Sequence, residues 1–142
     1  MFTNISNDQI KDILKEKDLR VTYQRILIFH ELFISNEHPT AEMIYEKLKI
    51  DHPMLSLGTV YKTLDCFYHS GLIRKLNGND AIVHYDADLN VHTHLIPKGS
   101  NQIIDYHDEE LTRLITDYFK GRQIEHYKIT DFELNLFGES TN

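Results

Sequence analysis

Hydrophobic residues recur at three- and four-residue steps through the first half of the chain, as they do in helices that bury one side. Polar capping residues and helix-breaking residues divide this pattern into segments. The segments predict four helices: residues 7–17, residues 22–36, a third that follows Thr40 and closes at residues 51–53, and a fourth between Ser56 and Gly71.

A hairpin is predicted directly after the fourth helix. Its strands lie around residues 72–76 and 81–85, and Asn77-Gly78-Asn79-Asp80 between them is typical of a tight turn, because Asn and Gly accept a positive φ. Helices followed by a two-stranded wing predict a winged helix-turn-helix.

The pattern changes after residue 90. It predicts short strands at residues 91–96 and 102–106, a helix at 108–120, and a long strand from 123 to 137 with a bulge near Thr130-Asp131. About fifty residues with few apolar positions form a poor independent core, so we expect this half to pair with a second copy. The chain is therefore predicted to be α+β, with a winged-helix DNA-binding domain (residues 1–86), a hinge (87–91) and a small α/β dimerisation domain (92–142).

Charge and composition limit the function classes. The chain has 142 residues and a net charge of −7, which argues against a non-specific polyanion binder. The charge is still compatible with a basic face on one side of the protein. A dimer would then be needed for useful DNA affinity. The single cysteine, Cys66, excludes an internal disulfide. The apolar runs are short and the N-terminus has no export pattern, so we expect a cytoplasmic protein with no membrane partner.

Side chains suited to DNA lie on the outer face of the fourth predicted helix and near it. Tyr61, Thr59 and Lys62 can reach base edges or phosphates in a major groove. The alternative is a solvated helix face of mixed charge. The residues expected to grip the DNA backbone are Arg20, Tyr23, Arg25, Arg74 and Lys75.

A candidate metal site lies at the start of the second half. His92 and His94 project from the same side of an extended strand, and Asp86 and Asp105 flank them. Such a pair alone is more often a polar turn, and the winged helix upstream favours the metal interpretation. Taken singly, His84 and His107 are expected at the surface.

Several motifs together resemble the ferric uptake regulator (Fur) family of bacterial metalloregulators. They are Leu19-Arg20-Val21-Thr22-Tyr23-Gln24-Arg25, His38-Pro39-Thr40-Ala41, Ser56 to Leu64 (SLGTVYKTL), His92-Thr93-His94 and Ile103-Ile104-Asp105-Tyr106. The resemblance implies a homodimeric, metal-dependent repressor of double-stranded operator DNA. It also implies a regulatory site for Fe²⁺ or Mn²⁺, with Zn²⁺ as an alternative. Its ligands would be His38, Asp86, His92, His94 and Asp105.

Asp105 bears on the subtype. With aspartate at this position, the chain resembles the peroxide-sensing regulators (PerR). In those proteins oxidation of ligand histidines releases DNA, and the resemblance implies that the oxidised residues here would be His38 and His92. An iron-, manganese- or zinc-responsive uptake regulator without peroxide sensing is the alternative. A metalloenzyme is the rival from another class, but the sequence offers no additional general base or nucleophile. We therefore do not expect an enzyme.

The chain departs from the family pattern at the structural zinc site. Most members hold that zinc with two CxxC pairs, whereas Pro97-Lys98-Gly99-Ser100 and Gly138-Glu139-Ser140 stand at those places here. A four-cysteine zinc site is thus excluded. The dimer is then expected to depend on strand pairing and on apolar contacts from Ile124, Ile129, Leu134, Leu136 and Phe137.

Overall fold

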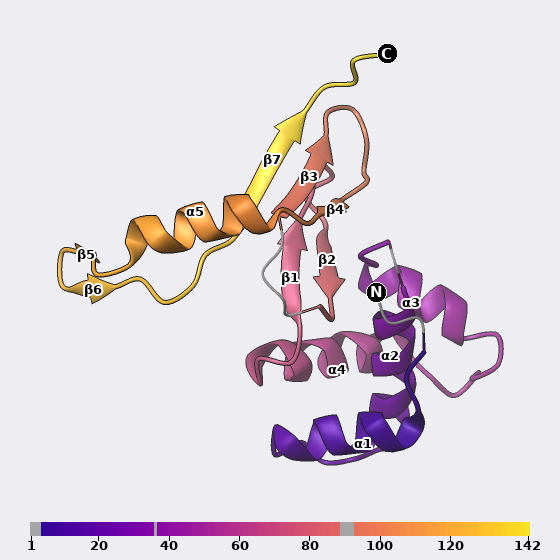
Figure 1. The fold of residues 1–142 in the computed structure, drawn as a ribbon. Coiled ribbons are helices and arrows are strands. Elements are labelled where there is room, and N and C mark those ends of the chain that lie inside the picture. The colour runs from indigo at the N-terminus through magenta and orange to yellow at the C-terminus, as the bar shows by residue number, and fades with distance from the viewer. Residues whose placement is uncertain (1–3, 36, 89–92) are drawn as a thin grey trace. The chain divides into compact units, whose positions relative to one another are not determined.

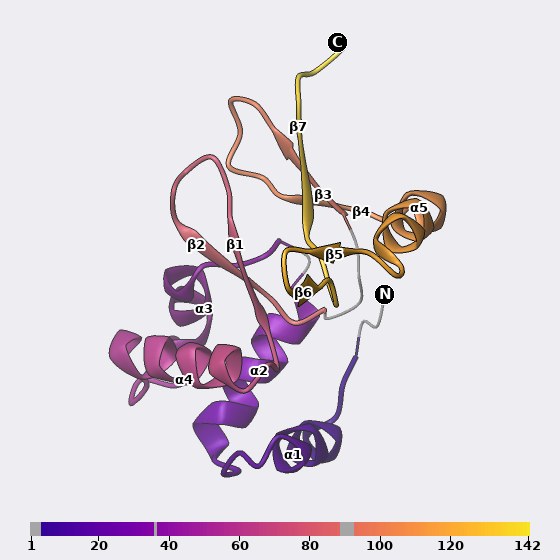
Figure 2. The ribbon, with the colours of Figure 1, turned by 90° about the vertical axis from the view of Figure 1, so that its left-hand side faces the viewer.

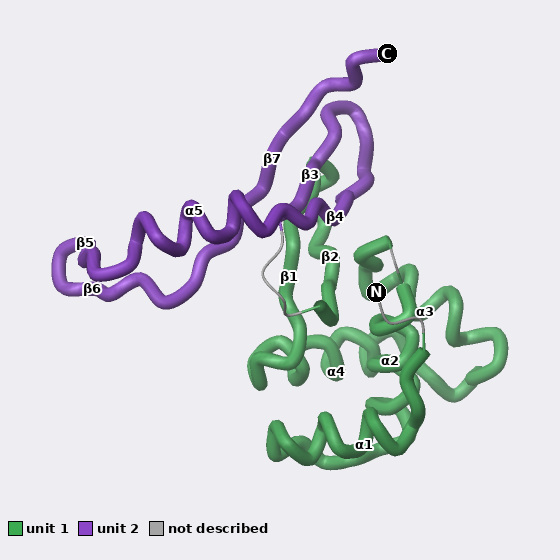
Figure 3. The backbone as a smooth tube through the Cα atoms, viewed as in Figure 1, with its two compact units in different colours: residues 1–89 green, residues 90–142 purple. Residues whose placement is uncertain are grey.

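The chain forms two compact units, residues 1–89 and 90–142 (Figure 3). The structure, a computed structural model, describes residues 4–35, 37–88 and 93–142. The hinge predicted for residues 87–91 lies partly outside these ranges. Within them, every helix is too short or too polar to cross a membrane. Each unit is described by itself below.

The described residues of the N-terminal unit form four helices and a hairpin (Figure 1). Each helix begins where a side-chain hydroxyl accepts a hydrogen bond from the backbone N–H three residues later. These four caps are Ser6, Thr22, Thr40 and Ser56. The elements are α1 (Asn7–Glu16), α2 (Tyr23–Ile34), α3 (Ala41–Leu48), α4 (Leu57–His69), β1 (Arg74–Asn77) and β2 (Val83–Asp86).

The apolar faces of all four helices meet in one core. Leu14, Ile28, Ile44 and Leu64 are almost completely buried, one from each helix. Phe67 of α4 packs edge-on against Phe29 of α2, with their ring centroids 5.8 Å apart. This packing fixes α4 against the other helices and leaves its opposite face to solvent.

The hairpin pairs β1 with β2 in antiparallel register, from Arg74 opposite Asp86 to Asn77 opposite Val83. Both strands begin two residues later than predicted. The turn is longer than the predicted one because Ala81 takes a positive φ of 58° and the Asp80 carboxylate accepts a hydrogen bond from the Ile82 N–H. With four helices and this wing, the predicted winged helix-turn-helix is confirmed.

The C-terminal unit is built on a three-stranded sheet of order β4-β3-β7 (Figure 2). The central strand β3 is antiparallel to β4 and parallel to β7. Helix α5 begins after the capping carboxylate of Asp108. The elements are β3 (Thr93–Pro97), β4 (Ile104–Tyr106), α5 (Glu109–Phe119), β5 (Gln123–Ile124), β6 (Tyr127–Lys128) and β7 (Leu134–Gly138).

The prediction of one long strand from 123 to 137 is wrong. Glu125 takes a positive φ of 56° and reverses the chain, so β5 and β6 form a small hairpin. After β6 the chain leaves extended pairing, and the Asp131 carboxylate accepts a hydrogen bond from the Phe132 N–H. The strand is therefore interrupted near Thr130-Asp131, where the sequence predicts a bulge within a continuous strand.

The C-terminal unit buries little apolar surface. Among its described residues, the buried ones are Thr93, His94, Ile96 and Ile103. Helix α5 is strongly amphipathic, yet it has no buried residue. The large exposed hydrophobic residues of this unit include Leu114, Tyr118, Ile124, Tyr127, Leu136 and Phe137.

Candidate metal centre and DNA-binding face

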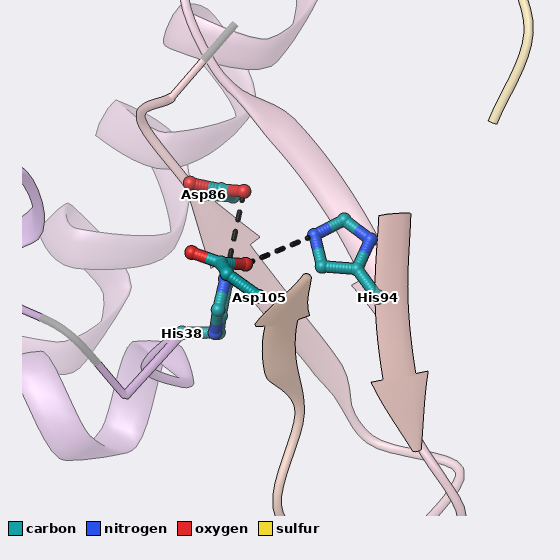
Figure 4. Close-up of side chains that lie close together, drawn as sticks. All are labelled: His38, Asp86, His94 and Asp105. Carbon is teal, nitrogen blue, oxygen red and sulfur yellow. Dashed lines mark ion pairs between the residues drawn. The ribbon is translucent and has the colours of Figure 1, made fainter. Parts of the chain in front are cut away.

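One histidine-aspartate pair lies in the N-terminal unit. His38 stands between α2 and α3 with a positive φ of 50°, and Asp86 is the last residue of β2. His38 Nε2 lies 3.6 Å from Asp86 Oδ2, and both side chains are buried (Figure 4). The Asp86 Oδ1 atom accepts a hydrogen bond from the Asp88 N–H at 2.9 Å, which orients the carboxylate.

Strand β2 holds the loop that carries His38. The Tyr85 N–H donates to the Pro39 carbonyl oxygen at 2.9 Å, and His84 Nδ1 lies 2.7 Å from the His38 carbonyl oxygen. His84 is only 5% exposed, so the expectation that it lies at the surface is wrong. The sequence gives no local sign of this burial, because the partners of His84 include a loop 46 residues away.

A second histidine-aspartate pair lies in the C-terminal unit. His94 of β3 stands directly opposite Asp105 of β4 in the antiparallel register, so their side chains share one face of the sheet. His94 Nε2 is 3.5 Å from Asp105 Oδ1 (Figure 4). His92, the fifth predicted ligand, lies outside the described residues.

The spacing within each pair fits two ligands of one metal ion. A direct charge-assisted hydrogen bond would bring nitrogen and oxygen to about 2.7–2.9 Å. Two ligand atoms that are each about 2.1 Å from a shared ion lie about 3.0–3.4 Å apart in octahedral or tetrahedral geometry. The observed 3.6 Å and 3.5 Å are closer to the second arrangement. Imidazole and carboxylate donors without sulfur suit Fe²⁺, Mn²⁺ or Zn²⁺.

Residues 97–100 and 138–140, where most family members have their two CxxC pairs, are connected here by strand pairing and an ion pair. Pro97 pairs with Gly138 in the parallel β3–β7 register, and the Lys98 N–H donates to the Gly138 carbonyl oxygen at 2.8 Å. Lys98 Nζ also forms an ion pair with Glu139 Oε1 at 2.9 Å. The only cysteine of the chain, Cys66, belongs to α4 of the N-terminal unit and is distant in sequence from both segments. These residues do not fit a four-cysteine zinc site.

The outer face of α4 carries the predicted DNA-contacting side chains. Thr59 Oγ1 is 2.9 Å from the capping Ser56 Oγ. The Tyr61 hydroxyl donates to the Glu42 carboxylate of α3. This hydrogen bond raises the pKa of Tyr61 to about 12 and lowers the pKa of Glu42. The neighbouring Lys62 is exposed.

Several of the predicted phosphate contacts have partners within the unit. The Arg25 guanidinium donates to the Arg20 carbonyl oxygen at 2.7 Å. Lys75 Nζ lies 3.2 Å from Asp65 Oδ1 and 4.4 Å from the ring centroid of Tyr68. Other members of the predicted set are Arg20, which is exposed; Arg74, which is half-buried; and Tyr23, whose hydroxyl is 3.2 Å from His52 Nδ1.

A sequence profile with the description Ferric uptake regulator family matches residues 16–137. The chain belongs to the ferric uptake regulator family. This membership confirms the resemblance drawn from the motifs, and it makes the protein a metal-dependent transcription regulator. Family members act as regulators of transcription and not as enzymes.

Individual relatives support the assignment. The chain is 33% identical to the peroxide operon regulator of Bacillus subtilis (strain 168) over 120 residues, covering 83% of each protein. It is 31% identical to the peroxide-responsive repressor PerR of Staphylococcus aureus (strain Mu50) over 125 residues, covering 88% of this chain and 82% of the relative. The ferric uptake regulator from Pseudomonas aeruginosa with manganese shares the fold, with a TM-score of 0.81 at 23% identity, covering 94% of this chain and 98% of that one.

Proposed function

We propose that the protein is a repressor that binds operator DNA when one Fe²⁺ or Mn²⁺ ion per subunit is bound, with Zn²⁺ as the alternative ion. The ligands are His38, Asp86, His92, His94 and Asp105. The observation that carries this proposal is the ligand-like spacing within two imidazole-carboxylate pairs, 3.6 Å and 3.5 Å. In this proposal the ion takes ligands from both units of the chain. Metal binding would therefore restrict the orientation of the two units and favour the arrangement of the units that binds operator DNA.

Dimerisation is the second part of the proposal. The C-terminal unit leaves Ile124, Leu136 and Phe137 exposed, while Ile129 and Leu134 are half-buried. A second copy would cover these side chains, and it would present two recognition helices to two half-sites of DNA. The net charge of −7 makes this doubling important, because a single winged helix of this composition has a weak electrostatic attraction to DNA.

We further propose that the protein senses hydrogen peroxide. The support is Asp105 and the relatives that are named a peroxide operon regulator and a peroxide-responsive repressor. Bound Fe²⁺ supplies the redox chemistry that activates peroxide. In the net reaction one peroxide oxygen is added to a ring carbon of His38 or His92, and the other leaves as water. The oxidised imidazole is a poorer ligand, so metal and DNA are released.

A DNA-binding titration tests the proposal. The metal-free protein is titrated with Mn²⁺ and, without air, with Fe²⁺, and peroxide is then added before mass spectrometry of the peptides that contain His38 and His92. Metal-stimulated binding, release by peroxide and the mass of one added oxygen atom are expected with Fe²⁺. Stimulation without release identifies an iron or manganese regulator. No effect of metal contradicts the corepressor function.

The variant His92→Ala sharpens the site assignment. It removes one ligand, so Mn²⁺-stimulated DNA binding should be lost while the dimer stays folded. Circular dichroism and light scattering provide the controls for fold and dimer. Retained Mn²⁺ stimulation in this variant would remove His92 from the site.

A further inference from the structure

His84 links a metal-ligand loop to the tip of the wing. Its Nδ1 lies 2.7 Å from the main-chain carbonyl oxygen of His38, and its Nε2 lies 2.9 Å from the Asp80 carboxylate in the hairpin turn. The side chains of His84 and Asp80 are 6% and 11% exposed. Three residues thus form a continuous hydrogen-bonded path within the N-terminal unit.

The chemistry of this path fixes the direction of its hydrogen bonds. A carbonyl oxygen only accepts, so His84 Nδ1 donates to His38. The hydrogen bond from His84 lowers the pKa of Asp80, which favours an ionised carboxylate that also only accepts. The imidazole of His84 therefore lies between a main-chain acceptor on one side and a side-chain carboxylate on the other, so both of its ring nitrogens have a partner.

The register of β2 explains why His84 acts on His38 in particular. His84 and Asp86 are two residues apart on one strand, so their side chains lie on the same face. His84 reaches the main chain of His38, while Asp86 Oδ2 lies 3.6 Å from its ring. The backbone of His38 also takes a positive φ of 50°, a conformation that a non-glycine residue holds only when its surroundings support it.

We propose that His84 and Asp80 are positioning residues that hold His38 in its metal-binding conformation and connect it to the tip of the wing. This inference rests on the proposed role of His38 as a ligand. Neither residue would contact the ion. Their effect is instead to reduce the reorganisation that His38 needs before it binds, as residues around metal ligands commonly do.

The path should couple metal binding at His38 to the conformation of the wing, and DNA binding at the wing to the conformation of His38. A metal ion that fixes His38 also fixes the carbonyl oxygen to which His84 donates, and thereby the turn that carries Asp80. A wing held by DNA favours the same arrangement of His38. By linkage, the two effects on affinity are equal in size.

The variant Asp80→Asn tests the path with little change in shape. The amide oxygen of this variant can still accept the hydrogen bond from the Ile82 N–H that supports the turn, but His84 no longer has a carboxylate as its partner. Outer partners of metal ligands are typically worth about 10- to 100-fold in metal affinity. We expect Mn²⁺ binding by calorimetry to weaken by about tenfold, near the lower end of that range. His84→Gln removes the link itself and should weaken it at least as much.

Two matched controls separate positioning from general effects of substitution. His69→Gln removes another histidine whose Nδ1 contacts a main-chain carbonyl oxygen, that of Asp65 at 2.8 Å. Asp12→Asn removes an exposed carboxylate of α1. Both should bind Mn²⁺ as the wild type does. The visible absorption spectrum of bound Co²⁺ adds a readout of coordination geometry, and it should shift only in the Asp80 and His84 variants.

The outcomes distinguish this inference from the proposed function. If His38→Ala loses Mn²⁺ binding while Asp80→Asn and His84→Gln keep the wild-type affinity and Co²⁺ spectrum, the positioning role is wrong and the metal site stands. If His38→Ala binds Mn²⁺ as the wild type does, the site assignment fails and the inference fails with it. Should His84→Gln not fold, Asp80→Asn decides, because it leaves the core and the turn hydrogen bond in place.

Discussion

The two units of this chain differ in how completely they bury their helices. In the N-terminal unit each of four helices contributes almost fully buried apolar residues to one core. In the C-terminal unit α5 has no buried residue, and Leu114 and Phe137 are 64% and 63% exposed. A unit that folds around its own core needs no partner, whereas a unit with uncovered apolar faces is suited to bind another copy. The proposed functions follow the same division, with DNA reading in the first unit and dimerisation in the second.

Phe67→Ala should give the largest effect. Phe67 is completely buried at the centre of the N-terminal core, and truncating such a residue typically costs about 3–5 kcal/mol. Urea unfolding of the N-terminal unit should show this loss. Phe137→Ala is the comparison, since Phe137 is 63% exposed in the chain considered alone. Equal losses for a monomeric sample would contradict the contrast between the units.

Phe137→Asp should weaken the dimer more than it destabilises the folded monomer. A carboxylate at this exposed position costs the monomer little, but burying it unpaired in an interface is unfavourable. We expect the dimer dissociation constant to rise by at least about tenfold, which corresponds to about 1.4 kcal/mol. Sedimentation equilibrium measures it. An unchanged dimer would place the interface elsewhere.

Glu42→Gln should change the titration of Tyr61 without unfolding the N-terminal unit. The Glu42 carboxylate raises the pKa of Tyr61 to about 12, because it accepts a hydrogen bond from the hydroxyl and repels the phenolate. The neutral amide lacks that repulsion, so Tyr61 should ionise at a lower pH, closer to 10.0. NMR of ¹³C-labelled tyrosine rings follows this ionisation, with Tyr61→Phe assigning the signal. If the titration is unchanged, the Glu42 carboxylate is not the group that raises the pKa of Tyr61.

Lys98→Met should give the smallest effect. The Lys98–Glu139 ion pair is exposed on both sides, and such pairs contribute about 0–1 kcal/mol. The strand pairing of Pro97 with Gly138 remains, so thermal unfolding should shift little.

Chelators should leave the dimer intact, because no four-cysteine zinc holds it. Dissociation of the dimer by a chelator would show that a metal supports the interface.

The sequence predicts the N-terminal unit well because its signals are local. Capping hydroxyls at Ser6, Thr22, Thr40 and Ser56 lie three residues from the backbone they cap, so the helix starts were predicted to within a residue. The sequence also named His94 and Asp105 as candidate metal ligands, and the structure adds that they stand directly opposite each other on β3 and β4.

The failures of prediction depend on conformations and contacts that a pattern does not encode. The positive φ of Glu125 reverses the chain within a segment that the sequence pattern predicts as one strand. His84 looks like any polar residue of a wing until β2 lies against the loop that carries His38. The Lys98–Glu139 contact joins residues 41 positions apart. Each of these required the tertiary structure.

The parallel pairing of β3 with β7 has a kinetic consequence. The hairpin of β3 and β4 closes over a short loop, but β7 returns to β3 only after an intervening helix and a second hairpin. Until it returns, β3 presents an unpaired edge that β7 of another molecule fits as well. Refolding at high protein concentration should therefore yield strand-exchanged dimers alongside native ones, and dilution before refolding should suppress them.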